Sequence, residues 1–180
     1  GCHTSARKTG ALLMALNGKG FNRNYVRITA KDAELETLSM SPAPAPFQHP
    51  RLSDSGDRLL VSVASSSGTL HRTTSPHDFE LTQTVVTRYV NMNLDIADLD
   101  LKSGTKSLLA GASDPGYLEL QAVWSPDGGT VAFVRYKPWG KMNIWTVPYN
   151  GGKGGIPRPL LGADQTGQDN YFPEFSPDGR

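Results

Sequence analysis

The 180-residue chain carries 18 Lys and Arg against 17 Asp and Glu, a net charge of +1, which argues against a nucleic-acid-binding surface built on excess positive charge. Its 19 glycines and 13 prolines favour many short strands joined by turns over long helices. One cysteine excludes an internal disulfide framework and a four-cysteine metal site, and the longest apolar run, six residues, is far below the roughly 20 that a membrane-spanning helix needs.

The N-terminal residues can be interpreted in two ways. Cys2 and Thr4 fall in register with Ala122 and Trp124 of a later repeat, which predicts a strand. The alternative is a lipid anchor at Cys2, because Gly-Cys resembles the cleaved end of a bacterial lipoprotein signal. We favour the strand, since the repeat register resumes by Ser5. The missing initiator Met and an end inside a turn lead us to expect a fragment of a longer protein.

A repeated block runs along the whole chain. It begins at Ser5, Ser53, Ser125 and Ser176, and these serines are 48, 72 and 51 residues apart. Two of the intervals lie near the roughly 40–50 residues of one propeller blade, and the longer interval implies an insertion. The two sharpest copies read Ser-Pro-Asp-Gly and follow an aromatic residue.

The chemistry of the block predicts a hairpin turn. Pro presets φ for the first central position, Asp suits the second, and Gly supplies the positive φ with which the returning strand begins. The aromatic residues just before the turn, Trp124 and Phe175, are predicted to pack between repeats. The residues assigned structural turn roles are Asp54, Gly56, Pro126, Asp127, Gly128, Pro177, Asp178 and Gly179.

The second half of each repeat predicts two further strands. Residues 24–28, 93–99 and 142–147 alternate apolar and polar side chains, which is typical of half-buried strands. A short fourth strand is expected to end at Leu38, Leu109 and Leu161. Each repeat thus predicts a four-stranded antiparallel meander. His49, before Pro50 at a strand start, is given a structural role.

The Trp-Ser-Pro-Asp-Gly and Phe-Ser-Pro-Asp-Gly blocks, with Asn143 to Gly152 between them, resemble the WD40-like repeats of the TolB-like propeller superfamily. The resemblance implies an all-β fold, a β-propeller of four-stranded antiparallel blades, of which this chain would supply about half of a six- to eight-bladed ring. We expect a single partial propeller domain over 1–180, with repeat units at 5–52, 53–124 and 125–175 and the start of a fourth at 176–180.

Loop length varies on one side of the predicted blades. The variable segments run from Ser65 to Tyr89, Tyr136 to Lys141, Ser39 to Gln48, Ala110 to Glu119 and Gly162 to Asn170. In a meander all five fall on the same face, which makes that face our candidate for recognition. The alternative is that insertions collect there because loops tolerate added length cheaply. The candidate recognition residues are His71, Arg72, His77, Arg88, Tyr136 and Trp139.

No catalytic, cofactor-binding or metal-binding residues are assigned. The segment Gly111 to Pro115 has Pro where a nucleophile elbow needs its second Gly. His71, His77 and Asp78 match no established metal-ligand spacing. No phosphate-binding loop is present, and we therefore lean against an enzyme while leaving the question open.

The family resemblance implies a non-catalytic protein- or peptide-interaction module in the bacterial cell envelope or periplasm, with no nucleic-acid partner. The alternative is the substrate-gating propeller domain of a prolyl-oligopeptidase-type serine peptidase, whose catalytic domain would lie beyond Arg180. A weaker third option is a sugar-active propeller such as an oligogalacturonate lyase, which would need a histidine cluster for a metal.

Overall fold

A computed structural model describes residues 3–10, 12–17, 23–28, 35–38, 48–64, 94–103, 105–137, 140–163, 165 and 167–179. In these residues the regular secondary structure is β-strand, apart from one short 3-10 turn, η1 (Asn150–Gly152). None of the helical structure in the described residues has the length and apolar character to cross a membrane.

The strands form three four-stranded antiparallel sheets, each in chain order. The first sheet contains β1 (His3–Ser5), β2 (Leu12–Asn17), β3 (Arg23–Ile28) and β4 (Leu35–Leu38). The second contains β5 (Gln48–Leu52), β6 (Arg58–Ala64), β7 (Leu94–Asp100) and β8 (Lys106–Leu108). The third contains β9 (Leu118–Trp124), β10 (Thr130–Tyr136), β11 (Met142–Pro148) and β12 (Arg158–Pro159). The predicted all-β fold of repeated meanders is confirmed.

The sheets start one strand earlier than the predicted repeat units. Each of the first three repeated turns joins the first and second strands of one sheet, so the strand before the turn pairs with the strand after it. The expected end of the last strand at Leu161 is wrong. β12 ends at Pro159, and a turn closed by the Ala163 N–H on the Leu160 carbonyl follows directly.

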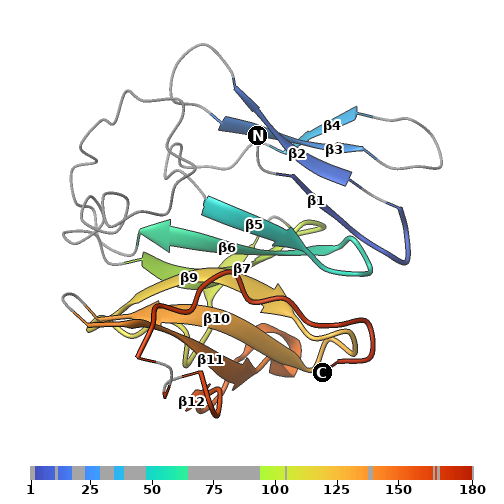
Figure 1. Cartoon of the computed structure of the whole chain (residues 1–180). Helices are drawn as coiled ribbons and strands as arrows, with labels where there is room; N and C mark the ends of the chain where they lie inside the picture. Colours follow the sequence, from blue (N-terminus) through green and yellow to red (C-terminus); the bar gives the residue numbers. More distant parts are fainter. Residues whose placement is uncertain are drawn as a thin grey trace.

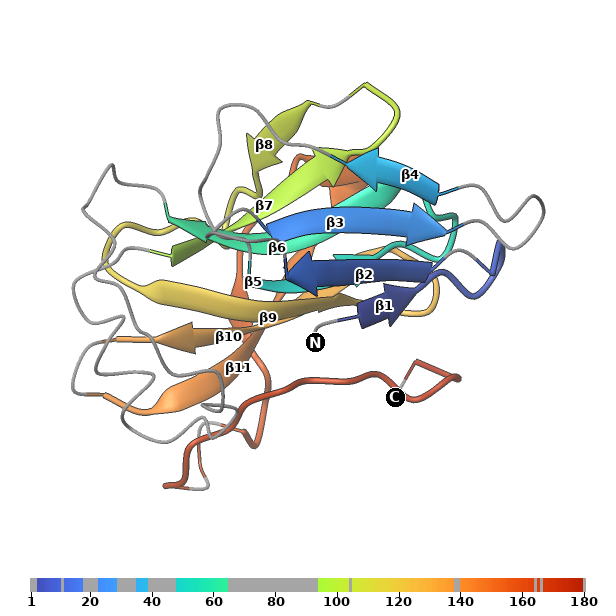
Figure 2. The ribbon, with the colours of Figure 1, turned by 90° about the horizontal axis from the view of Figure 1, so that it is seen from above.

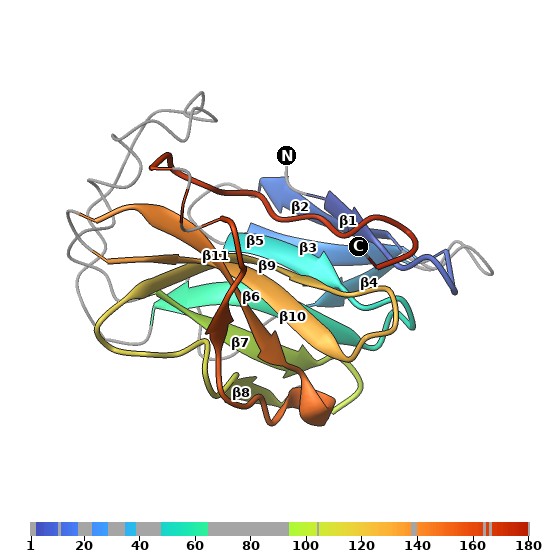
Figure 3. The same cartoon turned by 60° about the horizontal axis from the view of Figure 1, so that its bottom comes forward.

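The three sheets are stacked in chain order (Figure 1). Seen from above, the sheets overlap, and the strands of one sheet lie at an angle to those of the next (Figure 2). The first strands of consecutive sheets are in contact, β1 with β5 and β5 with β9. The C-terminal segment 168–179 runs along the side of the molecule that carries these first strands (Figure 3). We call the surface formed by β1, β5, β9 and residues 168–176 the inner-strand surface.

Apolar side chains from facing sheets form the core. Ala6 packs with residues of β5, β6 and β7, and the second sheet packs on the third through Leu60, Ile96 and Phe133. Trp124 and Phe175 are half-buried against clusters that contain residues of both the second and the third sheet, as predicted for residues between repeats. Burial of these side chains stabilises the stack by roughly 25 cal/mol per Å² of apolar surface.

Candidate functional site

The predicted recognition residues are mostly outside the described part of the chain. Five of them fall outside the described residues, and their role stays a prediction: His71, Arg72, His77, Arg88 and Trp139. Tyr136 is described at the end of β10, where its side chain is 8% exposed and packs in an apolar cluster of the third sheet. That burial gives Tyr136 a packing role and leaves little of its surface for a ligand.

The repeated turns share one backbone geometry. Gly56, Gly128 and Gly179 have φ of 75°, 73° and 83°, and each N–H donates to the carbonyl of the serine three residues earlier. In the third sheet the Ser125 hydroxyl and the Gly129 N–H donate to Asp127, and these bonds hold the pKa of that carboxyl below its usual range.

The second sheet varies this pattern. Asp54 stands where the third sheet has Pro126, and its carboxylate accepts a hydrogen bond from Arg7 Nε at 3.0 Å. The hydroxyls of Ser53 and Ser55 both donate to Asp57 instead, and Ser55 is the main cause of the low pKa of Asp57. Asp54 therefore adds a contact with the first repeat to its predicted turn role.

A second repeated feature lies on the inner-strand surface. His49, Gln121 and Phe172 each stand four residues before the turn serine, and each has a left-handed φ, of 51°, 56° and 53°. In β5 and β9 this residue begins a bulge, where two residues face one residue of the neighbouring strand. Such a φ is uncommon outside glycine and is unusual for a bulky residue such as Phe.

Phe172 contacts both of the other left-handed residues. The Phe172 N–H donates to Gln121 Oε1 at 2.7 Å, and the His49 and Phe172 rings meet edge to face with centroids 6.2 Å apart. Tyr171 packs edge to face on Phe172, and these two aromatic side chains are 47% and 50% exposed. The left-handed positions thus bring residues of three repeats to one place.

Sequence reasoning gave His49 a structural role and missed the other two positions. The available signal was a proline at the same position of two repeats, because Pro50 and Pro173 both stand three residues before the turn serine. Ala122 at the third equivalent position breaks that pattern, so the motif is visible in only two of the repeats.

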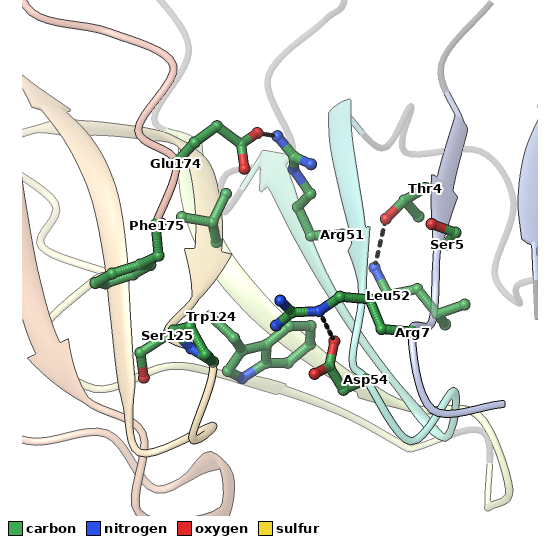
Figure 4. A pocket seen from close by; sticks show the side chains of 12 residues that line it. Thr4, Ser5, Arg7, Arg51, Leu52, Asp54, Trp124, Ser125, Glu174 and Phe175 are labelled. Atoms are coloured by element: carbon green, nitrogen blue, oxygen red, sulfur yellow. Dashed lines mark hydrogen bonds and ion pairs between the residues drawn. The ribbon is translucent and has the colours of Figure 1, made fainter. Parts of the chain in front are cut away.

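Further along the same strands lies a cavity of about 350 Å³ (Figure 4). The first strands of all three sheets and the C-terminal segment contribute to its wall. Arg51 of β5 extends toward Glu174 and forms an ion pair with it, while Arg7 pairs with Asp54. Burial lowers the pKa of Arg51, and the Asp54 carboxylate raises that of Arg7. The apolar part of the wall includes Trp124 and Phe175.

Behind this surface, charged groups are buried within and between the sheets. Glu119 of β9 is 0% exposed and accepts hydrogen bonds from Arg135 Nη2 at 2.6 Å and Nε at 3.0 Å. The guanidinium lies 4.7 Å from the ring centroid of Trp145 and 4.9 Å from that of Tyr117. Burial raises the pKa of Glu119 to about 8, against the opposing effect of Arg135.

The structure brings together no obvious catalytic or metal-binding constellation in its described ranges. Within those ranges there is no group of three or more His, Cys, Asp or Glu side chains that could hold a metal ion. The arrangement on the inner-strand surface instead offers exposed aromatic rings beside paired charges. Those are groups suited to non-covalent recognition of another chain.

No protein-family model matches the sequence, and the curated proteins give no match either. Among solved structures, TolB from Acinetobacter baumannii is similar with a TM-score of 0.57 and 16% identity, over 98% of this chain and 34% of that one. A puromycin-hydrolyzing peptidase of Mycobacterium tuberculosis has a TM-score of 0.51 at 15% identity, over 83% of this chain and 20% of that one.

Hydrazine synthase of Kuenenia stuttgartiensis is also similar, with a TM-score of 0.50 and 16% identity, over 94% of this chain and 44% of that one. The chain therefore spans 34% of the TolB and 20% of the peptidase that it matches. At these identities the likeness concerns the fold and not the activity. The described sheets have the β-propeller fold of these structures, as the repeats predicted.

Proposed function

We propose that this chain is a non-catalytic protein- or peptide-binding module of a bacterial cell-envelope propeller protein, and that the inner-strand surface makes the contact. The observation that carries the proposal is the repeated left-handed residue. His49, Gln121 and Phe172 occupy one register in three repeats, and Phe172 contacts both of the others. Backbone outliers of this kind concentrate where a side chain must be aimed at a ligand.

The surroundings of these residues support binding of another polypeptide. Tyr171 and Phe172 expose about half of their surface, and amphipathic aromatic side chains are enriched at protein interfaces. The near-zero net charge favours a protein partner over nucleic acid. The periplasmic or envelope location is proposed from the likeness to TolB. A lipid anchor at Cys2 remains the alternative means of attachment.

We include the predicted recognition loops in the proposed binding surface. The connection Ser39 to Gln48 leads in sequence into β5, which carries His49, and Gly162 to Asn170 leads into the C-terminal segment, which carries Phe172. Trp139 and the Ser65 to Tyr89 loop stay in the proposed recognition face on the strength of their sequence positions. Trp139→Ala is expected to weaken partner binding without lowering the melting temperature.

The test is selection of a random peptide library on the full chain, followed by affinity measurements on the enriched peptides. Phe172→Ala should weaken binding at least about tenfold, because an exposed aromatic anchor is lost. Ile156→Ala is the matched control, since Ile156 is 79% exposed but lies away from the inner-strand surface, next to β12. Failure to enrich any peptide, or equal effects of the two variants, contradicts the proposal.

The second candidate is a substrate-gating propeller domain of a serine peptidase. Its support is the propeller fold shared with the puromycin-hydrolyzing peptidase. Sequencing the gene beyond the codon for Arg180 distinguishes the two candidate functions. A Gly-x-Ser-x-Gly elbow after further blades would favour the peptidase domain, and further blades without a hydrolase domain would favour the binding module.

A further inference from the structure

The cavity on the inner-strand surface contains two arginines with unused hydrogen-bonding capacity. A guanidinium carries five N–H donors in a fixed fork. Within the described residues, Arg7 uses Nε to bind Asp54 and Arg51 uses Nη2 to bind Glu174. Neither pair is the two-bond arrangement that a carboxylate forms with an arginine when both are free to align.

The Arg51–Glu174 pair is exposed enough to be exchanged. The two side chains are 37% and 61% exposed, and ion pairs this open to water contribute little to stability. Arg51 is the more enclosed partner, and burial lowers its pKa, so it has lost part of its water shell. A second carboxylate could therefore replace Glu174 on Arg51 at small cost.

The rest of the cavity wall suits an extended peptide. The Thr4 hydroxyl accepts the Leu52 N–H at 3.1 Å, which ties the first strands of two sheets together along the wall. Val123, Trp124 and Phe175 supply an apolar surface beside the arginines. The wall thus offers a site for a carboxylate next to a site for an apolar side chain.

We propose that this cavity binds a carboxylate of an acidic peptide, which pairs with Arg51 in place of Glu174 while a neighbouring apolar residue packs on Trp124 and Phe175. This inference rests on the proposed peptide-binding function and adds the chemistry of one subsite. Glu174 then acts as an internal competitor that favours strongly acidic ligands over neutral ones.

The probes are synthetic copies of one peptide enriched on the full chain. Each acidic residue is replaced in turn by its amide, and the C-terminus is made free or amidated, which distinguishes a side-chain carboxylate from a terminal one. One of these changes should weaken binding to the wild-type chain about tenfold, and the same change should have little effect on binding to Arg51→Gln.

Two further variants separate charge from geometry. Glu174→Gln should raise the affinity for the acidic peptide roughly 3–10-fold, because the competing carboxylate is removed. Arg51→Lys keeps the charge but loses the fork and should give an intermediate affinity with an unchanged melting temperature. Arg158→Gln is the control for loss of one positive charge, since Arg158 is exposed in β12.

The outcomes are distinguishable. Peptide binding that ignores every carboxylate change, or that Glu174→Gln weakens, overturns the carboxylate subsite and leaves the peptide-binding function standing. Equal effects of Arg51→Gln and Arg158→Gln overturn it as well. Failure of the full chain to bind any peptide overturns both proposals.

Discussion

At the scale of single residues, glycine fixes the shape of the repeated turn. Gly128 has φ of 73° and no atom within 4 Å of the position that a Cβ would take, so the cost of a side chain there is conformational. Gly154 has φ of 71° and its Cβ would also lie 2.1 Å from the Ala110 carbonyl oxygen. Gly129 has neither restriction, since its nearest contact would be an ordinary 3.4 Å to Asp127.

These differences predict an ordered series of stabilities. Gly129→Ala should leave the free energy of unfolding almost unchanged. Gly128→Ala should lower it by about 1–2 kcal/mol, the cost of a left-handed residue with a Cβ. Gly154→Ala should lower it by about 3 kcal/mol or more, because the backbone must also move away from Ala110. Urea unfolding of the three variants measures the series, and equal effects at positions 128 and 129 would refute the turn assignment.

The turns were predictable from sequence because their cause is local. Ser, Pro, Asp and Gly act within four consecutive residues, and the same four functions recur at Ser125 and Ser176. The left-handed φ of Gln121 is not local. Gln121 lies inside the continuous strand Leu118–Trp124, and only the two-against-one pairing with β10 shows the bulge.

At the scale of secondary-structure elements, strands β9 and β10 are joined by a buried, hydrogen-bonded pair of a glutamate and an arginine. Glu119 and Arg135 are directly opposite each other in the register, and both are at least 94% buried. Burial raises the pKa of Glu119 to about 8 from an ordinary value near 4.5. At a pH between these two values, Glu119 holds a proton in the folded state that it has released in the unfolded chain.

The free energy of unfolding should therefore fall as the pH rises from about 4.5 to 8. Glu119→Gln should remove most of that slope, because the amide does not titrate. Glu174→Gln is the control, since the Glu174 carboxylate is 61% exposed. Chemical denaturation at several pH values measures the slopes. A wild-type stability that rises over this range would show that Arg135 keeps Glu119 ionised.

The elements themselves were largely predictable, but their charged interior was not. Alternation gave strands at 24–28, 93–99 and 142–147, and the structure has them within one residue of those bounds. Alternation does not tell which polar residue is buried. Glu119 and Arg135 are 16 positions apart, and only the pairing of β9 with β10 shows that they meet.

At the scale of the whole molecule, a side-chain network ties the second sheet to the third. Tyr149, after β11, donates its hydroxyl hydrogen to Asp98 Oδ2 at 3.0 Å, and Asp98 is paired with Arg58 of β6. Gly152 allows this approach, since a Cβ there would lie 2.3 Å from the same oxygen. Burial, with the Asp98 charge, raises the pKa of Tyr149 to about 12.

Tyr149→Phe should lower the free energy of unfolding by about 1–2 kcal/mol, because a hydrogen bond to a buried carboxylate is lost. Tyr171→Phe, which removes a hydroxyl from an exposed ring, should change it by less than about 0.5 kcal/mol. Thermal unfolding compares the two variants. Equal stabilities would mean that Tyr149 does not join the sheets.

The stacking of the sheets follows from the repeat, because each meander buries its apolar faces only against its neighbours. The inter-sheet network does not follow from it. Tyr149 and Asp98 are 51 residues apart, and the position equivalent to Tyr149 in the second sheet is Leu101, which has no hydroxyl. Contacts that differ from one repeat to the next are invisible to a repeat-based prediction.

The most direct test of binding at the inner-strand surface is amide hydrogen exchange of the full chain with and without an enriched peptide. We expect slower exchange in 48–52, 118–124 and 168–176, with no change in the outer strands at 106–108 and 158–159. Protection confined to those outer strands would place the ligand on the opposite edge of the sheets and contradict the account.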